Sequence, residues 1–407
     1  MHRLHLVACS ALGLVGSAQE ALAVAHEAIG VGISAVSGRL PEPSSRHVLC
    51  DKEAIMAAVV RAIDLGFGNT KFITSSVDGK IECSHFPSLA VLAPGEKGVV
   101  DLVGKRKTVC VPVRGVWYEV GYDVEQAASA FKARPRHERY IETAEYMALT
   151  AGALRYMGCK TIELLVVGLP VSEYLAKRKD LEKLLKKEPI PIGGGGAVTI
   201  KEVLVLAQPH GALFDYLRQH GEGTGIRETR NLVVDVGYRT FDWLTTEGLK
   251  VYANMSYSVS IGVSQVLGAI ARKIGIENGM SELPDLDGID RALRQRKPLG
   301  VYQKQYDLKK FQADIDAVAD QAVGEMYTRI GKIYDIRNVV LVGGGASLYR
   351  RSVAKVFDRH KILEVADPLL ANVRGFQCLG EQHARKKVGG PAPDAAPQGA
   401  ASSEAGT

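Results

Sequence analysis

An internal repeat of twenty residues constrains the fold of this chain more than any other feature. The segments AIDLGFGNTKFITSSVDGKI (62–81) and VVDVGYRTFDWLTTEGLKVY (233–252) share one order: apolar, Asp, apolar, Gly and aromatic, then a β-like run and an acidic–Gly turn. A constant offset of 171 residues pairs Asp64 with Asp235, Gly66 with Gly237, Phe67 with Tyr238 and Phe72 with Trp243. Chance similarity of two hairpins is the alternative, but the agreement in order and turn spacing favours a duplication. A fixed offset this long indicates two related domains and not a solenoid.

Composition places the chain among ordinary globular proteins. Its 407 residues are 46% hydrophobic and 24% charged, with a net charge of +6, and this length can hold two or three domains. There is no arginine-rich arm, zinc-finger spacing or aromatic–basic stripe, so we expect no direct sequence-specific binding of nucleic acid. The six cysteines include no CxxC pair, which favours free thiols in a reducing cytoplasm over disulfides or a metal site.

The two ends of the chain differ from its middle. The start, MHRLHLVACSALGLVGSAQEALAVA, has some features of an export signal, but Arg3 leaves only about five residues before Cys9, too few for the apolar region of such a signal. We expect residues 1–55 to be a loosely structured extension, or to precede a functional start at Met56. The sequence has no run of 18 apolar residues, so it predicts no transmembrane helix. We expect a cytoplasmic protein without membrane contact.

Strand and helix patterns alternate through the rest of the chain, which predicts α/β architecture. The expected strands are 58–65, 72–77, 109–120, 162–168, 198–206, 231–236, 241–246 and 338–342, and the expected helices are 138–157, 172–187, 262–274, 308–332 and 347–358. The expected domains are a first domain at 56–229 with a β-rich insertion at 85–122, a second domain at 230–366, a C-terminal helix at 367–385 that returns to the first domain, and a disordered tail at 386–407.

The first repeat resembles a phosphate loop but fits neither common type. A Rossmann fingerprint needs GxGxxG at the start of a helix, whereas Gly66 and Gly68 are followed by a β-hairpin pattern and no third glycine. In GALRYMGCKT (152–161), Cys159 separates the glycine from Lys160 and a strand follows, so a P-loop also fails. The glycine run at 193–196 has no acidic or basic partner, and we interpret it as a flexible loop.

Glycine-containing hairpin turns can still bind phosphate, because their backbone N–H groups form an anion-accepting concavity. Two such turns, one in each domain, could hold the phosphates from opposite sides. Asp64 and Asp235 would suit water-mediated contact with Mg²⁺, which keeps several of its own waters, and Lys71 could meet the phosphates or be an ordinary surface lysine. After the apolar strand at 336–342, Gly343, Gly344 and Gly345 would let the chain approach a nucleoside closely.

These motifs, in this order, resemble the signature of the actin/sugar-kinase/heat-shock ATPase superfamily. LLVVGLP (164–170) and QPHGAL (208–213) resemble elements of the bacterial actin-like plasmid-segregation proteins, the ParM/StbA family. Within that family, the resemblance is greatest to protein D of PRTRC plasmid systems, and it covers roughly 58–383. It implies an α/β, actin-like two-lobed ATPase, with two ribonuclease-H-like domains flanking a nucleotide cleft and with ATP and Mg²⁺ as cofactors.

The resemblance also implies the site residues. The first phosphate loop would contain Asp64, Gly66, Gly68, Asn69, Thr70 and Lys71. The second would contain Asp235, Gly237, Tyr238, Arg239 and Thr240. Adenosine would lie against Gly343, Gly344, Gly345 and Ala346. Tyr238 and Arg239 depart from the Gly or Ser/Thr that is usual in the second loop, so Arg239 either adds positive charge near phosphate or points into solvent.

The catalytic assignment rests on Asp235, Gln208 and Asp64. Gln208 stands where the family has a Glu or Gln that positions the attacking water, and a neutral amide orients water without accepting its proton. Asp235 is the better candidate for polarising that water, while a packing role for Gln208 stays open. The expected hydrolysis is slow, as suits a timer on a conformational cycle.

Three functions remain on this fold. The first is an ATPase that polymerises with itself in plasmid partition and needs a centromere-binding adaptor protein encoded elsewhere. The second is a small-molecule kinase, and the third is a regulatory nucleotide switch. A chaperone would need an appended peptide-binding domain, which the low-complexity segment after residue 389 cannot supply.

Overall fold

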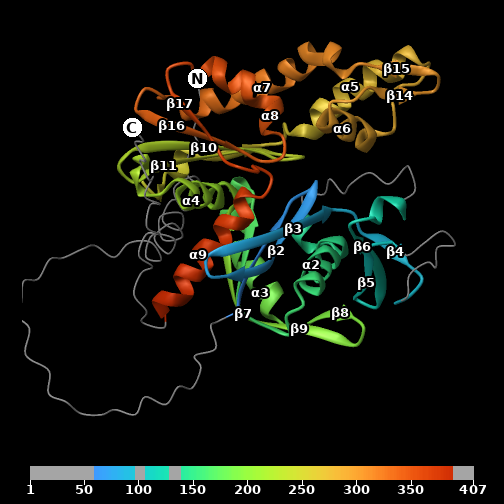
Figure 1. Cartoon of the computed structure of the whole chain (residues 1–407), viewed down its shortest axis with the longest axis vertical. Helices are drawn as coiled ribbons and strands as arrows, with labels where there is room; N and C mark the ends of the chain where they lie inside the picture. Colours follow the sequence, from blue (N-terminus) through green and yellow to red (C-terminus); the bar gives the residue numbers. More distant parts are fainter. Residues whose placement is uncertain (1–58, 97–105, 128–138, 388–407) are drawn as a thin grey trace, which may run out of the picture.

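Two β-sheets form the centres of two lobes, which lie one above the other in Figure 1. The computed structural model describes residues 59–96, 106–127 and 139–387. The predictions for residues 1–55 and for nearly all of 386–407 therefore lie outside the described residues. We call residues 59–207, together with the C-terminal helix, lobe I, and residues 230–365 lobe II.

Both sheets have the same core order of strands. The sheet of lobe I runs β3-β2-β1-β7-β9-β8 and that of lobe II runs β12-β11-β10-β16-β17. In lobe I the strands are β1 (Val60–Leu65), β2 (Asn69–Val77), β3 (Lys80–Pro87), β7 (Thr161–Leu169), β8 (Ile190–Gly193) and β9 (Gly196–Ala207). In lobe II they are β10 (Arg230–Val236), β11 (Phe241–Glu247), β12 (Lys250–Val251), β16 (Ile336–Val342) and β17 (Lys361–Glu364), with β13 (Tyr257–Val259) beside β11.

The duplication predicted from the sequence is visible in strand pairing. In each lobe the first strand pairs antiparallel with the next one, β1 with β2 and β10 with β11, and parallel with a later one, β1 with β7 and β10 with β16. The central strands are buried on both faces, as is usual when helices cover a parallel sheet on both sides. The predicted fold class, two related α/β domains, is confirmed.

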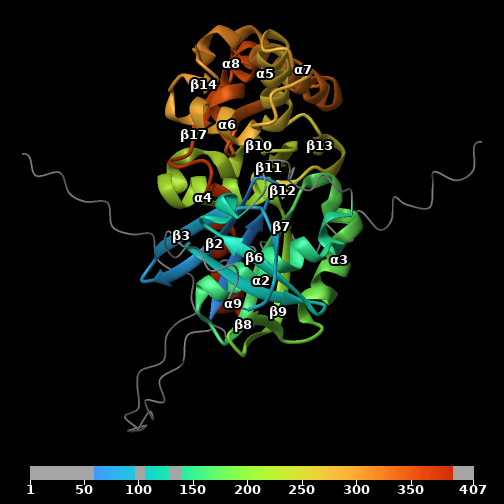
Figure 2. The same cartoon turned by 90° about the vertical axis from the view of Figure 1, so that its right-hand side faces the viewer.

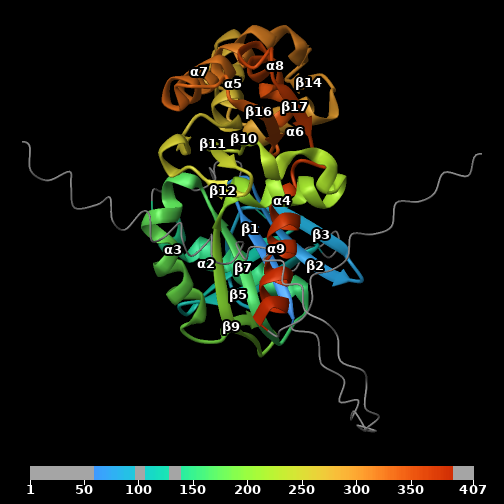
Figure 3. The same ribbon diagram turned by 90° about the vertical axis from the view of Figure 1, so that its left-hand side faces the viewer.

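Helices cover both faces of each sheet, as the three views show (Figures 1, 2 and 3). In lobe I, α2 (Ala144–Met157) and α3 (Val171–Lys186) lie on one face and α9 (Ala371–Lys387) on the other. In lobe II, one face carries α5 (Val263–Glu277), α6 (Leu286–Gln295), α7 (Gln312–Ile330) and α8 (Ala346–Val356), and α4 (Gln208–His220) lies on the other. None of the helices described here combines the length and apolar character needed to cross a bilayer.

Local chemistry moves two element boundaries away from their predicted places. The helix expected over 138–157 begins at Ala144, because Thr143 is extended and its hydroxyl accepts the N–H of Tyr146 as an N-cap. The single strand expected over 109–120 is wrong. Two strands, β5 (Thr108–Val113) and β6 (Val116–Gly121), form a hairpin there, and its turn residues Arg114 and Gly115 both have positive φ.

Several shorter elements complete the chain. The helix expected over 308–332 is divided into a 3₁₀ turn, η6 (Leu308–Phe311), and α7. The sequence patterns did not predict the helices α4 and α6 or the strand β17. They also did not predict the hairpin of β14 (Leu299–Val301) and β15 (Lys304–Tyr306). Within the segment expected as an insertion, β4 (Val91–Ala93) joins β5 and β6 in a small separate sheet, while β3 belongs to the main sheet of lobe I.

The two chain segments that connect the lobes, α4 and α9, touch at their backbones. A Cβ added to Gly375 would lie 1.7 Å from the carbonyl oxygen of Gly211, and one added to Gly211 would lie 2.3 Å from the carbonyl oxygen of Asn372. The ring of Phe376 is fully buried beside this contact, and a Cβ at Gly168 of β7 would lie 2.6 Å from it. Glycine is therefore required for the approach of these helices.

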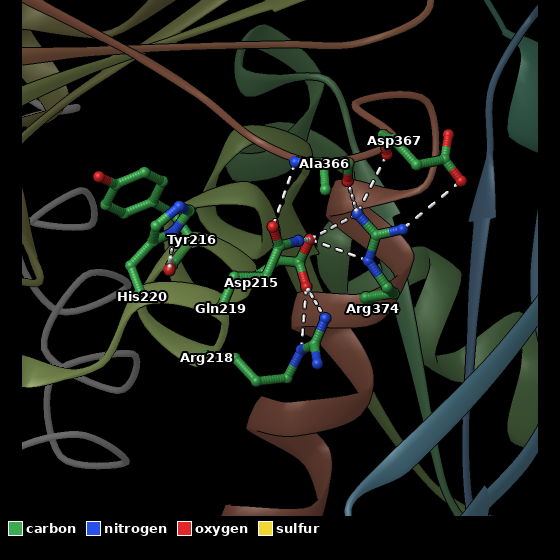
Figure 4. A network of polar contacts seen from close by, with 8 residues as sticks. All are labelled: Asp215, Tyr216, Arg218, Gln219, His220, Ala366, Asp367 and Arg374. Carbon is green, nitrogen blue, oxygen red and sulfur yellow. Dashed lines mark hydrogen bonds and ion pairs between the residues drawn. The ribbon is translucent and has the colours of Figure 1, made fainter. Parts of the chain in front are cut away.

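A buried ion network fixes the same crossing (Figure 4). Asp215 of α4 is fully buried and accepts hydrogen bonds from Nε and Nη2 of Arg374 at 2.9 and 2.7 Å. Arg218 also donates to Asp215. Arg374 reaches further and donates to the carbonyl groups of Ala366 and Asp367, where the chain leaves lobe II. A buried carboxylate with several charge-assisted donors is well compensated, so α4, α9 and this loop form one unit.

We predict that Gly375→Ala destabilises the protein by about 1–3 kcal/mol or more, because the added methyl group must separate α4 from α9. The matched control is Gly324→Ala on the exposed side of α7, where a Cβ meets nothing within 4 Å. That change should stabilise the helix by up to about 1 kcal/mol. Urea unfolding of the two variants measures both effects, and equal stabilities would contradict the close contact.

Candidate functional site

A cavity lies between the two lobes, with about 870 Å³ of space, part of it open to solvent. Both repeated hairpins, the first residues of α4 and α9, the glycine run after β16 and one side of α6 contribute to its lining.

The turns of the two hairpins have the same hydrogen bond. The N–H of Gly66 donates to the carbonyl of Asn69 at 3.2 Å, and the N–H of Gly237 donates to the carbonyl of Thr240 at 2.9 Å. Both turns line the cavity. The internal repeat therefore has a physical meaning, because it places two equivalent glycine turns on opposite sides of one space.

Asp64, at the end of β1, is fully buried and has a partner on each oxygen. Lys71 lies opposite it in the β1–β2 register and forms an ion pair with Oδ2 at 2.8 Å. The Nε2 of Gln208, the first residue of α4, donates to Oδ1 at 2.8 Å. All three side chains line the cavity, so the structure brings together two predicted catalytic residues and the predicted phosphate-binding lysine.

Asp235 occupies the equivalent place at the end of β10 but has different neighbours. Its Oδ2 accepts a hydrogen bond from Nδ2 of Asn372, on α9, at 2.6 Å. In the hairpin register it faces Asp242. Burial, and then the negative charge of Asp242, raise the pKa of Asp235 to about 7. A carboxyl group with this pKa can accept or release a proton near neutral pH.

Asp242 is a cavity residue that the sequence analysis missed. Its carboxylate is buried and accepts the N–H of Val171, at the start of α3, at 3.0 Å, and the hydroxyl of Ser258. Burial raises its pKa. The signal for it was present in the repeat, because the offset that pairs Asp64 with Asp235 also pairs Lys71 with Asp242.

The glycine run begins where β16 ends. Gly343 has φ +88°, and a Cβ there would lie 2.3 Å from Oδ1 of Asp235, while one at Gly345 would lie 2.4 Å from the side chain of Val263. These two glycines are required by protein packing as well as by any ligand. At Gly344 the nearest atom to an added Cβ is 3.1 Å away, on Leu369, and all three glycines line the cavity.

Two predicted site residues are not brought to the cavity. Thr70 is fully buried, and its hydroxyl is hydrogen bonded to Ser88 at 3.0 Å. Ala346 is buried in the first turn of α8. Neither of them lines the cavity, whereas Gly68, Asn69, Tyr238 and Arg239 do. The other glycine run, 193–196, is the turn of the β8–β9 hairpin and is also outside the cavity lining.

Arg239 points across the cleft. Its guanidinium lies 4.8 Å from the ring centroid of Phe67 in the glycine turn of the opposite lobe, and Phe67 stacks on Tyr140 at 4.5 Å. All three line the cavity. A cation over an aromatic face is a stabilising contact, so the two loops touch each other through these side chains.

On the side of α6, Arg294 reaches the glycine run, and its partner Asp290 also lines the cavity. Arg294 donates to Asp290 at 2.9 Å and to the carbonyl oxygen of Gly344 at 3.2 Å. Sequence reasoning missed both because α6 is short and was not expected. Its amphipathic pattern and the N-cap residue Asp285, whose carboxylate accepts the N–H of Gly288, are the signals that could have found it.

The donor set fits a phosphorylated ligand with a hydrated divalent cation. Glycine turns, Lys71, Arg239 and Arg294 offer anion-binding groups, and the carboxylates of Asp64 and Asp235 offer the oxygen ligands that Mg²⁺ prefers, directly or through water. Among the residues described, no three His, Cys, Asp or Glu side chains converge on a ready-made metal site.

Comparison with known proteins identifies the two halves separately. Residues 62–211 match the family described as actin like proteins N terminal domain, and residues 233–355 match the archaeal actin homologue MreB-like, C-terminal family. The archaeal actin homolog of Thermoplasma volcanium is 27% identical over 343 residues, which cover 80% of this chain and 99% of that protein. The homolog of Thermoplasma acidophilum matches with the same values.

Solved structures agree with the fold. The crystal structure of the archaeal actin homolog Ta0583 gives a TM-score of 0.64 at 24% identity, and its complex with ADP gives 0.62 at 23%. A ParM filament from Clostridium botulinum gives 0.64 at 17% identity. The first two cover 80% of this chain and 99% of the other, and the ParM structure covers 80% and 100%. The fold is actin-like.

We predict a pH-dependent stability that originates at Asp235. Its pKa is about 7 in the fold, against an ordinary value of 3.8, so the folded state binds the proton more tightly and is favoured at low pH. As the pH rises from about 4 to about 7, this group lowers the free energy of unfolding by up to roughly 1.4 kcal/mol per pH unit, and above that range the loss is complete.

Asp235→Asn removes this titration. Without nucleotide, the free energy of unfolding of the variant relative to that of the wild type should therefore be higher at about pH 8 than at about pH 5. Urea unfolding at the two pH values measures the gain. Asp180→Asn, at an exposed position on α3, is the control and should leave the pH dependence unchanged. A stability difference between Asp235→Asn and the wild type that is the same at both pH values would contradict the raised pKa.

Proposed function

We propose that this actin-like chain binds Mg²⁺–ATP between its lobes, hydrolyses it slowly, and assembles into filaments in the ATP-bound state. One observation carries the proposal: the same glycine turn with the same strand-end carboxylate occurs twice, on opposite sides of one cavity. The ADP complex of the similar archaeal actin homolog supports a nucleotide as the ligand.

Phosphate groups would be held by the two turns and by nearby cations. The N–H groups around Gly68 and Tyr238, with Lys71 and Arg239, are the donors that the chain offers. Mg²⁺ would neutralise phosphate charge beside Asp64 and Asp235. Lys71 forms an ion pair with Asp64 at 2.8 Å, which partly compensates the charge of this buried carboxylate beside the place of a hydrated cation.

Asp235 and Gln208 would act on the attacking water. With a pKa of about 7, Asp235 is suited to accept the proton of that water near neutral pH. The Nε2 of Gln208 is bound to Asp64, which leaves the carbonyl Oε1 of its amide as the atom that can orient a water. Because the amide of Gln208 cannot take the proton, proton transfer depends on Asp235 alone, and we expect slow turnover.

We extend the proposal to plasmid partition in the cytoplasm, as in the ParM/StbA family and in protein D of PRTRC systems. The similar ParM protein forms a filament, and this supports self-association as the mode of action that we propose here. A centromere-binding adaptor protein would connect such a filament to DNA, because the chain carries no motif for sequence-specific DNA binding.

ATP with Mg²⁺ should cause the wild-type protein to assemble. Light scattering and electron microscopy measure this assembly. Asp235→Ala should lower the rate of ATP hydrolysis at least about 100-fold, the usual contribution of a general base, and filaments should persist where ATP still binds. Asp320→Asn, a surface change on α7, is the control for hydrolysis. Unchanged hydrolysis in Asp235→Ala would remove this residue from the site.

Removal of Mg²⁺ with EDTA should weaken ATP binding by about tenfold or more, a loss of at least 1.4 kcal/mol, because phosphate charge then faces Asp64 and Asp235 directly. Titration calorimetry with and without Mg²⁺ measures the change. ATP turnover that needs an added metabolite, without assembly at any protein concentration, would instead indicate a small-molecule kinase.

A further inference from the structure

Each of the two strand-end carboxylates in the cleft is held by a carboxamide from the first turn of a helix that connects the lobes. Gln208 begins α4 and donates to Oδ1 of Asp64 at 2.8 Å. Asn372 is the second residue of α9 and donates to Oδ2 of Asp235 at 2.6 Å. Both amides are buried, with exposed fractions of 8% and 5%.

The second of these contacts crosses between the lobes. Asp235 belongs to the sheet of lobe II, whereas α9 packs on β1 and β7 of lobe I. Two residues after Asn372, Arg374 is bound to the buried Asp215 of α4 (Figure 4). The backbone of Asn372 itself lies against Gly211, because a Cβ on that glycine would be 2.3 Å from its carbonyl oxygen. The amide is thus carried by a rigid support.

We propose that Asn372 is a positioning residue for hydrolysis: from helix α9 of lobe I, its amide sets the carboxylate of Asp235 in lobe II, as Gln208 sets Asp64. The two amides stand on helices that touch at Gly211 and Gly375, so the α4–α9 pair holds the two carboxylates in one fixed relation across the cleft. This inference rests on the proposed function and assigns it a residue that acts through Asp235.

Two other roles for Asn372 give different results. If it only fills a polar gap, its removal lowers stability and leaves the catalytic rate of the folded protein unchanged. If it contacts the nucleotide, its removal weakens ATP binding. A positioning residue lowers kcat and leaves the affinity for ATP intact, and its effect disappears when the residue it positions is already lost.

The test uses Asn372→Leu, which keeps the side-chain size and removes the donor. We expect kcat to fall about 100-fold, the cost of a carboxylate misplaced by about 1 Å, with the Kd for ATP within about twofold of wild type. The matched control is Gln377→Leu, which removes another buried amide of α9, one that donates to the carbonyl of Val60 away from the cleft. That variant should keep the wild-type kcat.

A double-mutant cycle gives the second readout. Asp235→Asn alone and Asp235→Asn with Asn372→Leu should have the same kcat, because Asn372 acts only through Asp235. Two results would overturn the proposal. One is a double variant whose fall in kcat is the product of the two single falls, and the other is an unchanged kcat in Asn372→Leu. If Asn372→Leu does not fold, Asn372→Ala removes the same donor without a branched side chain, and the same results are expected.

A readout without hydrolysis separates this inference from the proposed function. A crystal structure of the Asn372→Leu variant should show the Asp235 carboxylate rotated away from its place beside Gly343, whether or not the protein hydrolyses ATP. A carboxylate in its original place would overturn the positioning role. Wild-type protein that binds no ATP would overturn the proposed function and leave this structural test to decide the role of Asn372.

Discussion

The contact between α4 and α9 at Gly211 and Gly375 is the constraint on which the rest of the structure depends. Both segments connect the lobes, and their backbones are so close that no side chain fits between them. The buried ion pair of Asp215 and Arg374 fixes the same crossing. Because each helix begins at the cavity, with Gln208 on α4 and Asn372 on α9, the packing of the two helices decides how the two halves of the cleft face each other.

The two halves are duplicates whose chemistry has diverged. In lobe I the hairpin places Lys71 opposite Asp64, and the ion pair compensates the buried carboxylate. In lobe II the same register places Asp242 opposite Asp235, and two buried carboxylates side by side favour protonation, since like charges at short distance are costly in a low dielectric. Asp64 therefore has a cation as its partner, whereas the pKa of Asp235, raised by burial and then by Asp242, suits it to exchange a proton.

Much of the site could be predicted because its parts are local in sequence. The Asp–x–Gly turns and the glycine run after a buried strand are short motifs, and the structure brings nearly all of their residues to one cavity. Thr70 and Ala346 are exceptions, because a motif does not show toward which face of a turn or helix each side chain points. Asn372 was missed for another reason: it reaches the cleft from a distant helix, and nothing near it in the chain marks it as a site residue. Arg294 was missed because its short helix, α6, was not expected.

The sequence by itself determined the duplication, the α/β class and the two glycine turns, since these depend on the hydrophobic period, on glycine in turns and on the fixed offset of the repeat. Only the tertiary structure decided which partners the two aspartates have. The pKa of Asp235 depends on burial and on Asp242 and Asn372, which lie 7 and 137 residues away in the chain. Burial and distance act through space, and they are defined only when the lobes are packed together.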